Sequence, residues 1–353
     1  MTDNILHKLN LEKFNLNRPF LLIDSSYMIF HRFFALRLWY KKAHKGETID
    51  EHKWLENETF MEKYKKLFFD GMKKIMKKRK IPDENVIFAF DARCYNVWRS
   101  KLVNRYKGTR KESHIKSKFF CYPIFTLAEE ELIKPFNNST SIRLHHENAE
   151  ADDINAVVAN LLTHITSEHI YIMASDTDYI QLCHNSNNSM FDPQIQVIDI
   201  KNNNIWNKYI SNHFNSLQYL ISKILVGDIS DNINPCNIKT SLLLYYDIID
   251  YSNAVSNKNS DYTKCTKNLA TKIVNDTNSE IYKILEKLII KNREFVKSRN
   301  MLEAIVNSNG DKNIVDIEID NISENGCFTH NQILIDFECI PVKIKNEIEK
   351  SLI

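Results

Sequence analysis

Residues 20–24 have the sequence FLLID, four consecutive apolar residues that run directly into an aspartate. The pattern recurs in residues 86–91 (VIFAFD) and, with Ala-Ser before the acid, in residues 170–176 (IYIMASD). Short apolar runs without polar alternation are typical of strands that are buried on both faces of a parallel sheet. The three runs therefore predict three strands of such a sheet, each followed by an aspartate.

Helical patterns separate these strands. Residues 60–79 place apolar side chains at helical spacing among lysines, and residues 151–163 repeat the pattern before the third strand. Two further short strands are expected at 142–145 and 196–200. Strands that alternate with helices predict an α/β layer fold, in which ligands bind outside the carboxyl ends of the strands.

The chain changes character near residue 204. Beyond it the clearest patterns are helical, at residues 217–226, 241–249 and 280–306. We therefore expect a short N-terminal extension over residues 1–18, an α/β domain over 19–204 and a mainly helical domain over 205–353.

The composition is that of an ordinary globular protein. Hydrophobic residues make up 43% and charged residues 26%, and 47 basic against 45 acidic side chains leave a net charge of +2. These values argue against a wholly disordered, fibrous or membrane chain. Seven scattered cysteines without a C-x-x-C spacing predict free thiols in a reducing compartment. We expect a soluble intracellular protein, in the cytoplasm, the nucleus or a viral replication site, with no membrane association.

Glycine is unusually scarce. The chain has 6 glycines in 353 residues, where roughly 7% is usual. Neither a G-x-G-x-x-G nor a Walker A sequence is present. Any chemistry on nucleotides must therefore use a device other than a glycine-rich phosphate loop.

Acidic side chains gather where the predicted strands and helices meet. Taken singly, Asp24 and Asp91 are more often helix caps than catalytic groups. Three denser clusters shift that balance: Glu150 with Asp152 and Asp153, Asp176 with Asp178, and Asp228 with Asp231. Capping explains any one cluster. It does not explain several clusters on separate elements that are expected to meet at one edge.

Up to nine carboxylates in one cleft would repel one another strongly unless cations lie between them. Oxygen ligands without histidine or cysteine suit hard ions, Mg²⁺ or Mn²⁺, better than zinc. Two such ions about 3.5 to 4 Å apart are a common arrangement for in-line attack on a phosphodiester. The acidic clusters therefore predict two metal ions per active site and metal-assisted phosphodiester hydrolysis.

A basic segment follows Asp91. Between residues 99 and 118 the only acid is Glu112, and the basic residues are Arg99, Lys101, Arg105, Lys107, Arg110, Lys111, Lys116 and Lys118. A charge run is often only a solvated face, which is an alternative for the part from Lys111 onwards. Arg99, Lys107 and Arg110 follow closely on a strand-end carboxylate, where they could hold a phosphate. Nearby aromatic residues, Tyr106 among them, could stack on unpaired bases or pack inside the protein.

Five segments in this order resemble the 5′-nuclease superfamily: LLIDSSYMIFHRFFAL, FAFDARCYNVWRSKLVNRYKGTRK, ENAEADDI, ASDTDYIQL and ILVGDISDNI. This superfamily includes phage and viral 5′–3′ exonucleases, flap endonucleases and the N-terminal nuclease domain of bacterial DNA polymerase I. The ending NQILIDFECIPVKIKNEIEKS also looks like that of the viral and bacterial branch. The resemblance runs from about residue 20 to the C-terminus.

The resemblance implies a role for each matching residue. Asp24, Asp91, Glu150 and Asp152 would lean toward the first metal, Asp176, Asp178 and Asp231 toward the second, with Asp153 close to both and Asp228 a supporting acid. Lys107 and Arg110 match the family's YK-x-x-R, at the base of a helical arch that would span about residues 111–137. Arg32 corresponds to the basic residue of the first helix, and Tyr106 to the aromatic beside the catalytic lysine.

One segment departs from the family pattern. Relatives usually have a glycine-bearing hairpin after GDISDNI, where backbone atoms bind duplex DNA and a monovalent ion. Here the sequence is NPCNIKTSLLLYYDII, without glycine. Whether an ion binds there is left open, and contact with the duplex is expected from Lys239, Thr240 and the nearby backbone.

The resemblance implies a PIN-like α/β core with a C-terminal module of the helix-hairpin-helix type. The expected activity is divalent-metal-dependent cleavage of DNA near single-strand/duplex junctions and 5′ ends, in replication or repair. Expected partners are DNA with a 5′ flap, a nick or a free 5′ end, together with replication proteins, and we expect a monomer. The alternatives are a PIN-like ribonuclease and a catalytically silent DNA-binding protein.

Overall fold

The computed structural model describes residues 11–45, 53–92, 96–103, 105–109, 122–136, 142–183, 193–205, 215–248, 261–298 and 323–352. Its contacts divide the chain into two compact units. Unit 1 comprises Met1–Val97, Lys111–Trp206 and Glu347–Ile353, and unit 2 comprises Trp98–Arg110 and Asn207–Asn346. Residues 98–110 thus group with the helical part of the chain. The domain boundaries expected from the sequence stay predictions.

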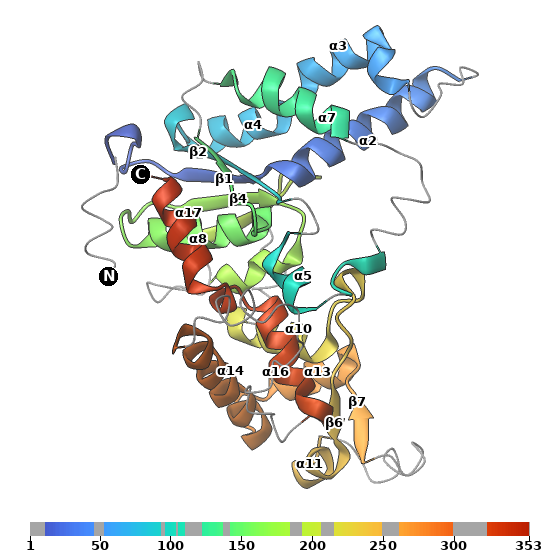
Figure 1. Cartoon of the computed structure of the whole chain (residues 1–353), viewed down its shortest axis with the longest axis vertical. Helices are drawn as coiled ribbons and strands as arrows, with labels where there is room; N and C mark the ends of the chain where they lie inside the picture. The colour runs from blue at the N-terminus through green and yellow to red at the C-terminus, as the bar shows by residue number, and fades with distance from the viewer. Residues whose placement is uncertain are drawn as a thin grey trace. The chain divides into compact units, whose positions relative to one another are not determined.

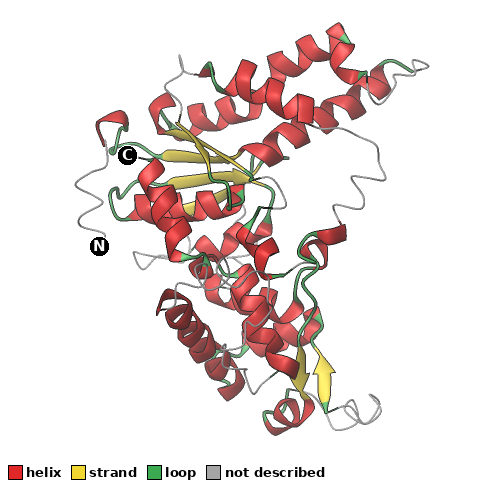
Figure 2. Ribbon diagram, viewed as in Figure 1, coloured by secondary structure: helices red, strands yellow, loops and turns green. Residues whose placement is uncertain are grey.

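Unit 1 is built on a five-stranded sheet in the order β3-β2-β1-β4-β5 (Figure 2). The strands are β1 (Phe20–Asp24), β2 (Val86–Phe90), β3 (Ile142–His145), β4 (Ile170–Ala174) and β5 (Ile195–Asp199). All four pairings are parallel. The carboxyl ends of all five strands therefore share one edge, which confirms the α/β fold expected from the sequence.

The apolar runs form the interior of the sheet because helices cover both of its faces. Every residue of β2 and β4 is buried. On one face lie α2 (Ser25–Ala43), α4 (Asp70–Arg79) and α7 (Tyr122–Leu127), with α3 (Glu58–Leu67) packed on α2. On the other lies α8 (Ala151–Thr163), beside the C-terminal part of α17 (Val342–Ser351) (Figure 1).

The helix predicted over residues 60–79 is wrong in one respect, because it is two helices. α3 ends at Leu67 and α4 begins at Asp70, with Phe68 and Phe69 between them. Neighbouring residues of an unbroken helix point about 100° apart. The interruption lets the two rings pack edge to face at 4.9 Å, and lets Phe69 also contact Phe136.

Unit 2 is mainly helical. Its helices are α5 (Trp98–Leu102), α10 (Ser216–Val226), α11 (Thr240–Tyr245), α13 (Lys267–Asn275), α14 (Glu280–Ser298) and α16 (Cys327–Ile335). α11 ends at Tyr245, four residues before the predicted end, and the end predicted for α14 lies outside the described residues. Where relatives have the glycine hairpin, β6 (Asn237–Lys239) pairs antiparallel with β7 (Tyr262–Lys264).

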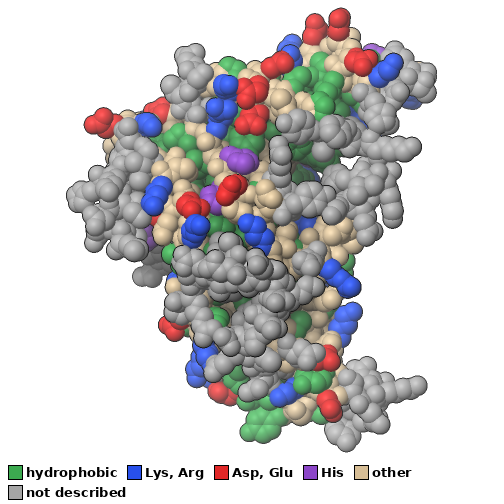
Figure 3. Space-filling model, in the orientation of Figure 1, with side chains coloured by type: hydrophobic (Ala, Val, Ile, Leu, Met, Phe, Trp, Pro, Cys, Tyr) green, Lys and Arg blue, Asp and Glu red, His purple; other side chains and the backbone are tan. Residues whose placement is uncertain are grey.

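Charges of both signs lie beside one another on the face drawn in Figure 3. This agrees with the small net charge of +2. Among the described residues, none of the helices has both the length and the apolar character that a membrane span requires.

Candidate metal centre

Two aspartates mark the carboxyl ends of the central strands. Asp24 ends β1 and caps α2, because its Oδ1 accepts a hydrogen bond of 2.9 Å from the backbone N–H of Tyr27. Asp91 follows β2, and its Oδ1 accepts from the N–H of Ala151 at 2.7 Å. The N–H of Asp91 donates to the Ser26 hydroxyl at 3.1 Å. Asp91 therefore ties the start of α2 to the start of α8.

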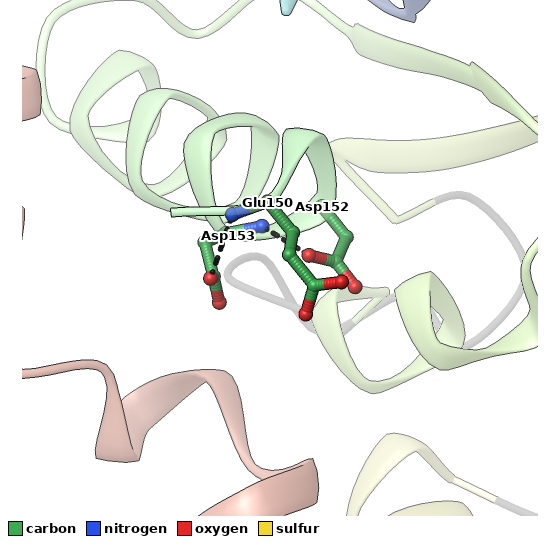
Figure 4. A group of neighbouring side chains, drawn as sticks. All are labelled: Glu150, Asp152 and Asp153. Atoms are coloured by element: carbon green, nitrogen blue, oxygen red, sulfur yellow. Dashed lines mark hydrogen bonds between the residues drawn. The ribbon is translucent and has the colours of Figure 1, made fainter. Parts of the chain in front are cut away.

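Three carboxylates project from the first turn of α8 (Figure 4). Each of Glu150, Asp152 and Asp153 offers an oxygen that lies within 4.8 Å of the other two. Asp153 Oδ2 accepts from the N–H of Glu150 at 3.2 Å, and Asp152 Oδ1 accepts from the N–H of Asp153 at 2.7 Å. Asp153 is fully buried and Glu150 is 7% exposed. Like charges this close and this buried repel one another unless a cation balances them.

The third cluster follows β4. Asp176 caps the short helix Thr177–Leu182, and its Oδ1 accepts from the N–H of Asp178 at 2.9 Å. Asp176 is exposed and Asp178 is half-buried. The pair therefore leaves the same edge of the sheet as Asp24 and Asp91.

Carboxylates from three elements of unit 1 influence one buried tyrosine. The Tyr179 ring is fully buried and its hydroxyl accepts a hydrogen bond from Asn155 at 3.1 Å. Burial raises the pKa of Tyr179 well above its usual value, and the negative charges of Asp24, Asp152 and Asp176 raise that pKa further. The negative charges of carboxylates from β1, from α8 and from the segment after β4 therefore all raise the pKa of one hydroxyl. Within unit 1 the structure brings the predicted acidic clusters together.

Two residues of this edge escaped the sequence analysis. Tyr179 follows directly after SDTD, and nothing in its position distinguishes it from a core aromatic. Asp199 could have been found, because β5 ends in IQVID just as β1 ends in FLLID. Its Oδ1 accepts from the Ser175 hydroxyl at 2.8 Å and from the N–H of Lys201 at 3.0 Å.

Unit 2 contains a separate group around Asp231. Lys107 Nζ lies 3.7 Å from Asp231 Oδ2, and the Tyr106 hydroxyl donates to the same oxygen at 3.3 Å. The N–H of Lys107 also donates to the Asp231 carbonyl at 3.1 Å. Tyr106 is 7% exposed and packs in the core of unit 2. Its burial argues against stacking on an unpaired base.

Asp228 forms an ion pair with a lysine side chain. Its Oδ2 accepts from Lys223 Nζ at 2.7 Å, and its Oδ1 accepts from the Ser230 hydroxyl. Burial alone would raise the pKa of Asp228, but the hydrogen bonds and charge of Lys223 and the bonds from Ser230 outweigh it and lower the pKa. The supporting role that the resemblance implies for this acid stays a prediction.

The remaining basic residues lie in different surroundings. Arg99 is 2% exposed, and its Nε donates to the Leu334 carbonyl at 2.7 Å, which argues against the predicted phosphate contact. Lys101 and Arg105 are exposed. Thr240 Oγ1 lies 3.0 Å from Thr263 Oγ1 across the β6-β7 ribbon, next to the half-buried Lys239. Four predicted residues lie outside the described residues: Arg110, Lys111, Lys116 and Lys118. Of the predicted arch, residues 111–121 and 137 lie outside them as well.

Arg32 lies on α2, two turns after Asp24. Its Nε and Nη2 are buried and have no hydrogen-bond partner among the described residues. Burial lowers the pKa of Arg32, and the carboxylate of Asp70 partly restores it. A buried cation without a hydrogen-bond partner costs folding free energy. This cost favours a role for Arg32 other than stabilising the fold.

The acidic residues of unit 1 fit hard divalent cations. They offer only carboxylate oxygens, from Asp24, Asp91, Glu150, Asp152, Asp153, Asp176 and Asp178, and oxygen ligands are preferred by Mg²⁺ and Mn²⁺. Among the described residues, Glu150, Asp152 and Asp153 form a group whose oxygens lie close enough together to hold one metal ion. The start of α8 is therefore the centre of the candidate site.

The model of one protein family matches residues 19–210, and its description is "5′-3′ exonuclease, N-terminal resolvase-like domain". The match covers every carboxylate described above in unit 1. No curated protein sequence matches the chain.

Solved structures of similar fold come from bacteriophage T5. The D15 flap endonuclease, in a pseudo-enzyme-product complex with DNA and metal ions, has a TM-score of 0.53 and 13% identity. The D15 protein co-crystallised with metal ions has a TM-score of 0.52, and the T5 5′-exonuclease with bound zinc a TM-score of 0.51, each at 13% identity. Each match covers 95% of this chain and 98% of the other. At this identity the likeness establishes the fold.

Proposed function

The chain belongs to the 5′-3′ exonuclease family, and we propose that it is a divalent-metal-dependent, structure-specific 5′-nuclease acting on DNA. Its substrates would be phosphodiesters near single-strand/duplex junctions and 5′ ends. The observation that carries the proposal is the set of carboxylates from β1, β2, β4 and α8 at one edge of the sheet. One oxygen from each of Glu150, Asp152 and Asp153 lies within 4.8 Å of the other two. The charges of Asp24, Asp152 and Asp176 also raise the pKa of the buried Tyr179.

The residues of this edge would bind Mg²⁺ or Mn²⁺, with two ions per site. Such ions supply an activated water and stabilise the leaving oxygen of the phosphodiester. Glu150, Asp152 and Asp153 hold their oxygens in place through the first turn of α8, where backbone N–H groups orient two of them. Asp91 fixes that turn to the sheet through Ala151. That Asp231 serves the same centre stays a prediction from the sequence.

Basic residues would contact the DNA phosphates. Lys107 is the candidate for the scissile phosphate, since its side chain is 21% exposed and its Nζ lies beside the Asp231 carboxylate. Arg32 offers two buried donors for an anion. The DNA and metal ions in the T5 flap endonuclease complex support a DNA substrate for this chain. A role in replication or repair, with replication proteins as partners, is part of the proposal.

The test compares products from matched substrates. The protein is incubated in Mg²⁺ with a 5′-flap duplex, a nicked duplex, a blunt duplex and an RNA version of the flap strand, each labelled at either end. We expect cleavage near the flap junction, with 5′-phosphate and 3′-hydroxyl ends. Faster cleavage of the RNA would favour a PIN-like ribonuclease. Binding of the flap without turnover in Mg²⁺ or Mn²⁺ would favour a silent DNA-binding protein.

A further inference from the structure

A strongly basic helix in unit 1 plays no part in the metal centre. Residues 65–80 (KKLFFDGMKKIMKKRK) contain eight basic side chains and one acid, and α4 is formed by the second half of this stretch. The buried side chains of α4, Met72, Ile75 and Met76, pack into the core of unit 1. The lysines are therefore left at the surface, without a role in the proposed reaction.

A pocket of about 710 Å³ lies between α4 and the π-helix Ala128–Ile133 with the turn after it. Its apolar lining includes Phe69, Leu132 and Phe136, and its basic lining is Lys73, Lys77 and Lys80. Two acids, Asp83 and Glu131, also line it, and Glu131 is paired with Lys65. All three lysines are exposed, and both phenylalanines are half-buried. The volume falls within the usual range for ligand sites, roughly 300 to 1,000 Å³. The pocket therefore combines an apolar floor with a charged rim in which three lysines outnumber two acids.

The pocket is distinct from the metal centre. Two of its lining residues, Ile81 and Asp83, lie just before β2 begins at Val86. They are therefore at the amino end of that strand, whereas Asp91 follows its carboxyl end. None of the predicted metal ligands lines the pocket.

The backbone at Lys80 is unusual for a lysine. Lys80 ends α4 in the left-handed conformation, with φ 56° and ψ 39°, and its N–H donates to the Met76 carbonyl. Glycine is the common residue at such a helix end because a Cβ is strained there. The strain is tolerated at a position that adds a third cation to the pocket rim. A functional contact of the lysine side chain would account for this.

We propose that this pocket binds an acidic peptide segment of a partner protein, with carboxylates on the lysines and an apolar side chain on the floor. A nucleic acid fits less well, for two reasons. The rings of Phe69 and Phe136 pack against each other at 4.9 Å and both contact Phe88, so they are engaged in packing. A nucleic-acid strand carries a charge at every nucleotide, so some of its phosphates would face Asp83 or Glu131. A peptide can instead space its carboxylates to meet the lysines and avoid the two acids.

The test measures the binding of a fluorescein-labelled synthetic peptide to the full chain by fluorescence anisotropy. In this peptide, aspartates flank an Ile-Phe pair. Two control peptides replace either the aspartates or the Ile-Phe pair by serine. The pocket variant is Lys77→Glu with Lys80→Glu. The matched control is Lys66→Glu with Lys78→Glu, which makes the same charge change on α3 and α4 at residues that do not line the pocket.

We expect the acidic Ile-Phe peptide to bind in the micromolar range and each control peptide at least about tenfold more weakly. The pocket variant should lose about tenfold or more, and the matched control should stay within about twofold. Equal losses in both variants would show unspecific charge attraction and overturn the proposal, as would absence of binding. A single-stranded oligonucleotide is then added as a competitor. If it displaces the peptide, and if its own binding also needs Lys77 and Lys80, the pocket is assigned to nucleic acid instead. Flap cleavage by the pocket variant, measured in parallel, should match wild type.

Discussion

Lys107 Nζ lies 3.7 Å from Asp231 Oδ2, and the backbones of the same two residues are joined by a hydrogen bond of 3.1 Å. The pair couples the segment after α5 to the loop after α10. Lys107 has a φ of 51°, a conformation that is uncommon outside glycine. The structure therefore fixes the predicted catalytic lysine beside a predicted metal ligand, at some cost in backbone strain.

Replacing Lys107 by alanine removes the cation expected to stabilise charge on the scissile phosphate. We expect the turnover number for flap cleavage to fall by about 10² to 10³, with a small change in KM. Lys101→Ala is the matched control, since Lys101 is exposed on α5 nearby. Steady-state kinetics on a 5′-flap duplex check this. Equal effects of the two substitutions would contradict a specific role for Lys107.

Arg32→Met separates folding from function. The substitution removes a half-buried arginine whose Nε and Nη2 are buried and have no hydrogen-bond partner among the described residues. The melting temperature should therefore stay the same or rise. If the guanidinium meets a DNA phosphate, losing that charged hydrogen bond, roughly 1.5 to 3 kcal/mol, should weaken flap binding by about tenfold or more. Thermal unfolding and binding in Ca²⁺ measure both effects. A large loss of stability with unchanged binding would make Arg32 a structural residue.

Gly227→Ala should destabilise unit 2. Gly227 has a φ of 70°, and an added Cβ would lie 2.5 Å from the Ile233 carbonyl oxygen and 2.6 Å from the Asn234 backbone. Because neither backbone group can move cheaply, we expect a loss of about 3 kcal/mol in unfolding free energy. Gly108→Ala is the control, since an added Cβ there meets nothing within 4 Å. Urea unfolding compares the two variants, and similar losses in both would contradict the account.

Acid should destabilise unit 2 through Glu338. Burial alone would raise the pKa of Glu338, but the charges of Lys345, Lys297 and Arg293 outweigh it and lower the pKa below 4.5. A carboxyl group with a lowered folded-state pKa stabilises the protein above its unfolded pKa, and this stability disappears as the pH falls through the folded value. Glu338→Gln should cost up to about 1 kcal/mol at pH 7. The difference from wild type should shrink below about pH 4. A difference independent of pH would contradict the charge argument.

The sequence predicts the sheet of unit 1 closely because its apolar runs are short, unalternated and bounded by acids. β2 and α8 have the predicted ends, and β1 and β4 each differ by a single residue. β5 begins one residue earlier than expected. These elements are decided by local pattern, since helices cover both faces of the sheet.

The sequence predicts less of unit 2. The β6-β7 ribbon pairs residues 237–239 with residues 262–264. No local sequence pattern predicts a pairing of three residues over that separation. The buried state of Arg99 and Tyr106 also depends on distant segments, since Arg99 donates to Leu334 and Tyr106 to Asp231. Charge indicated a phosphate contact for Arg99, whereas the sequence left stacking and packing open for Tyr106. Tertiary packing buries both side chains.

Within the candidate site, residue type and strand position were enough to find the carboxylates. They were not enough to find Tyr179. Its ring is buried, and its pKa is raised by carboxylates from three elements that are distant in the sequence. Asp199 was missed although the β5 strand was predicted, because its acid falls inside the predicted range of that strand.

The central claim is that the carboxylates of unit 1 hold the ions for hydrolysis. The most direct measurement is single-turnover cleavage of a 5′-flap duplex over a Mg²⁺ titration, by wild type, Asp153→Asn and Asp176→Asn. Asp83→Asn is the matched control, since it makes the same charge change at an exposed position just before the amino end of β2. The account predicts cleavage that requires Mg²⁺ in wild type and falls by about 10² or more in both aspartate variants, with their folding and flap binding retained. Undiminished cleavage by both aspartate variants, or wild-type cleavage that persists in excess EDTA, would contradict it.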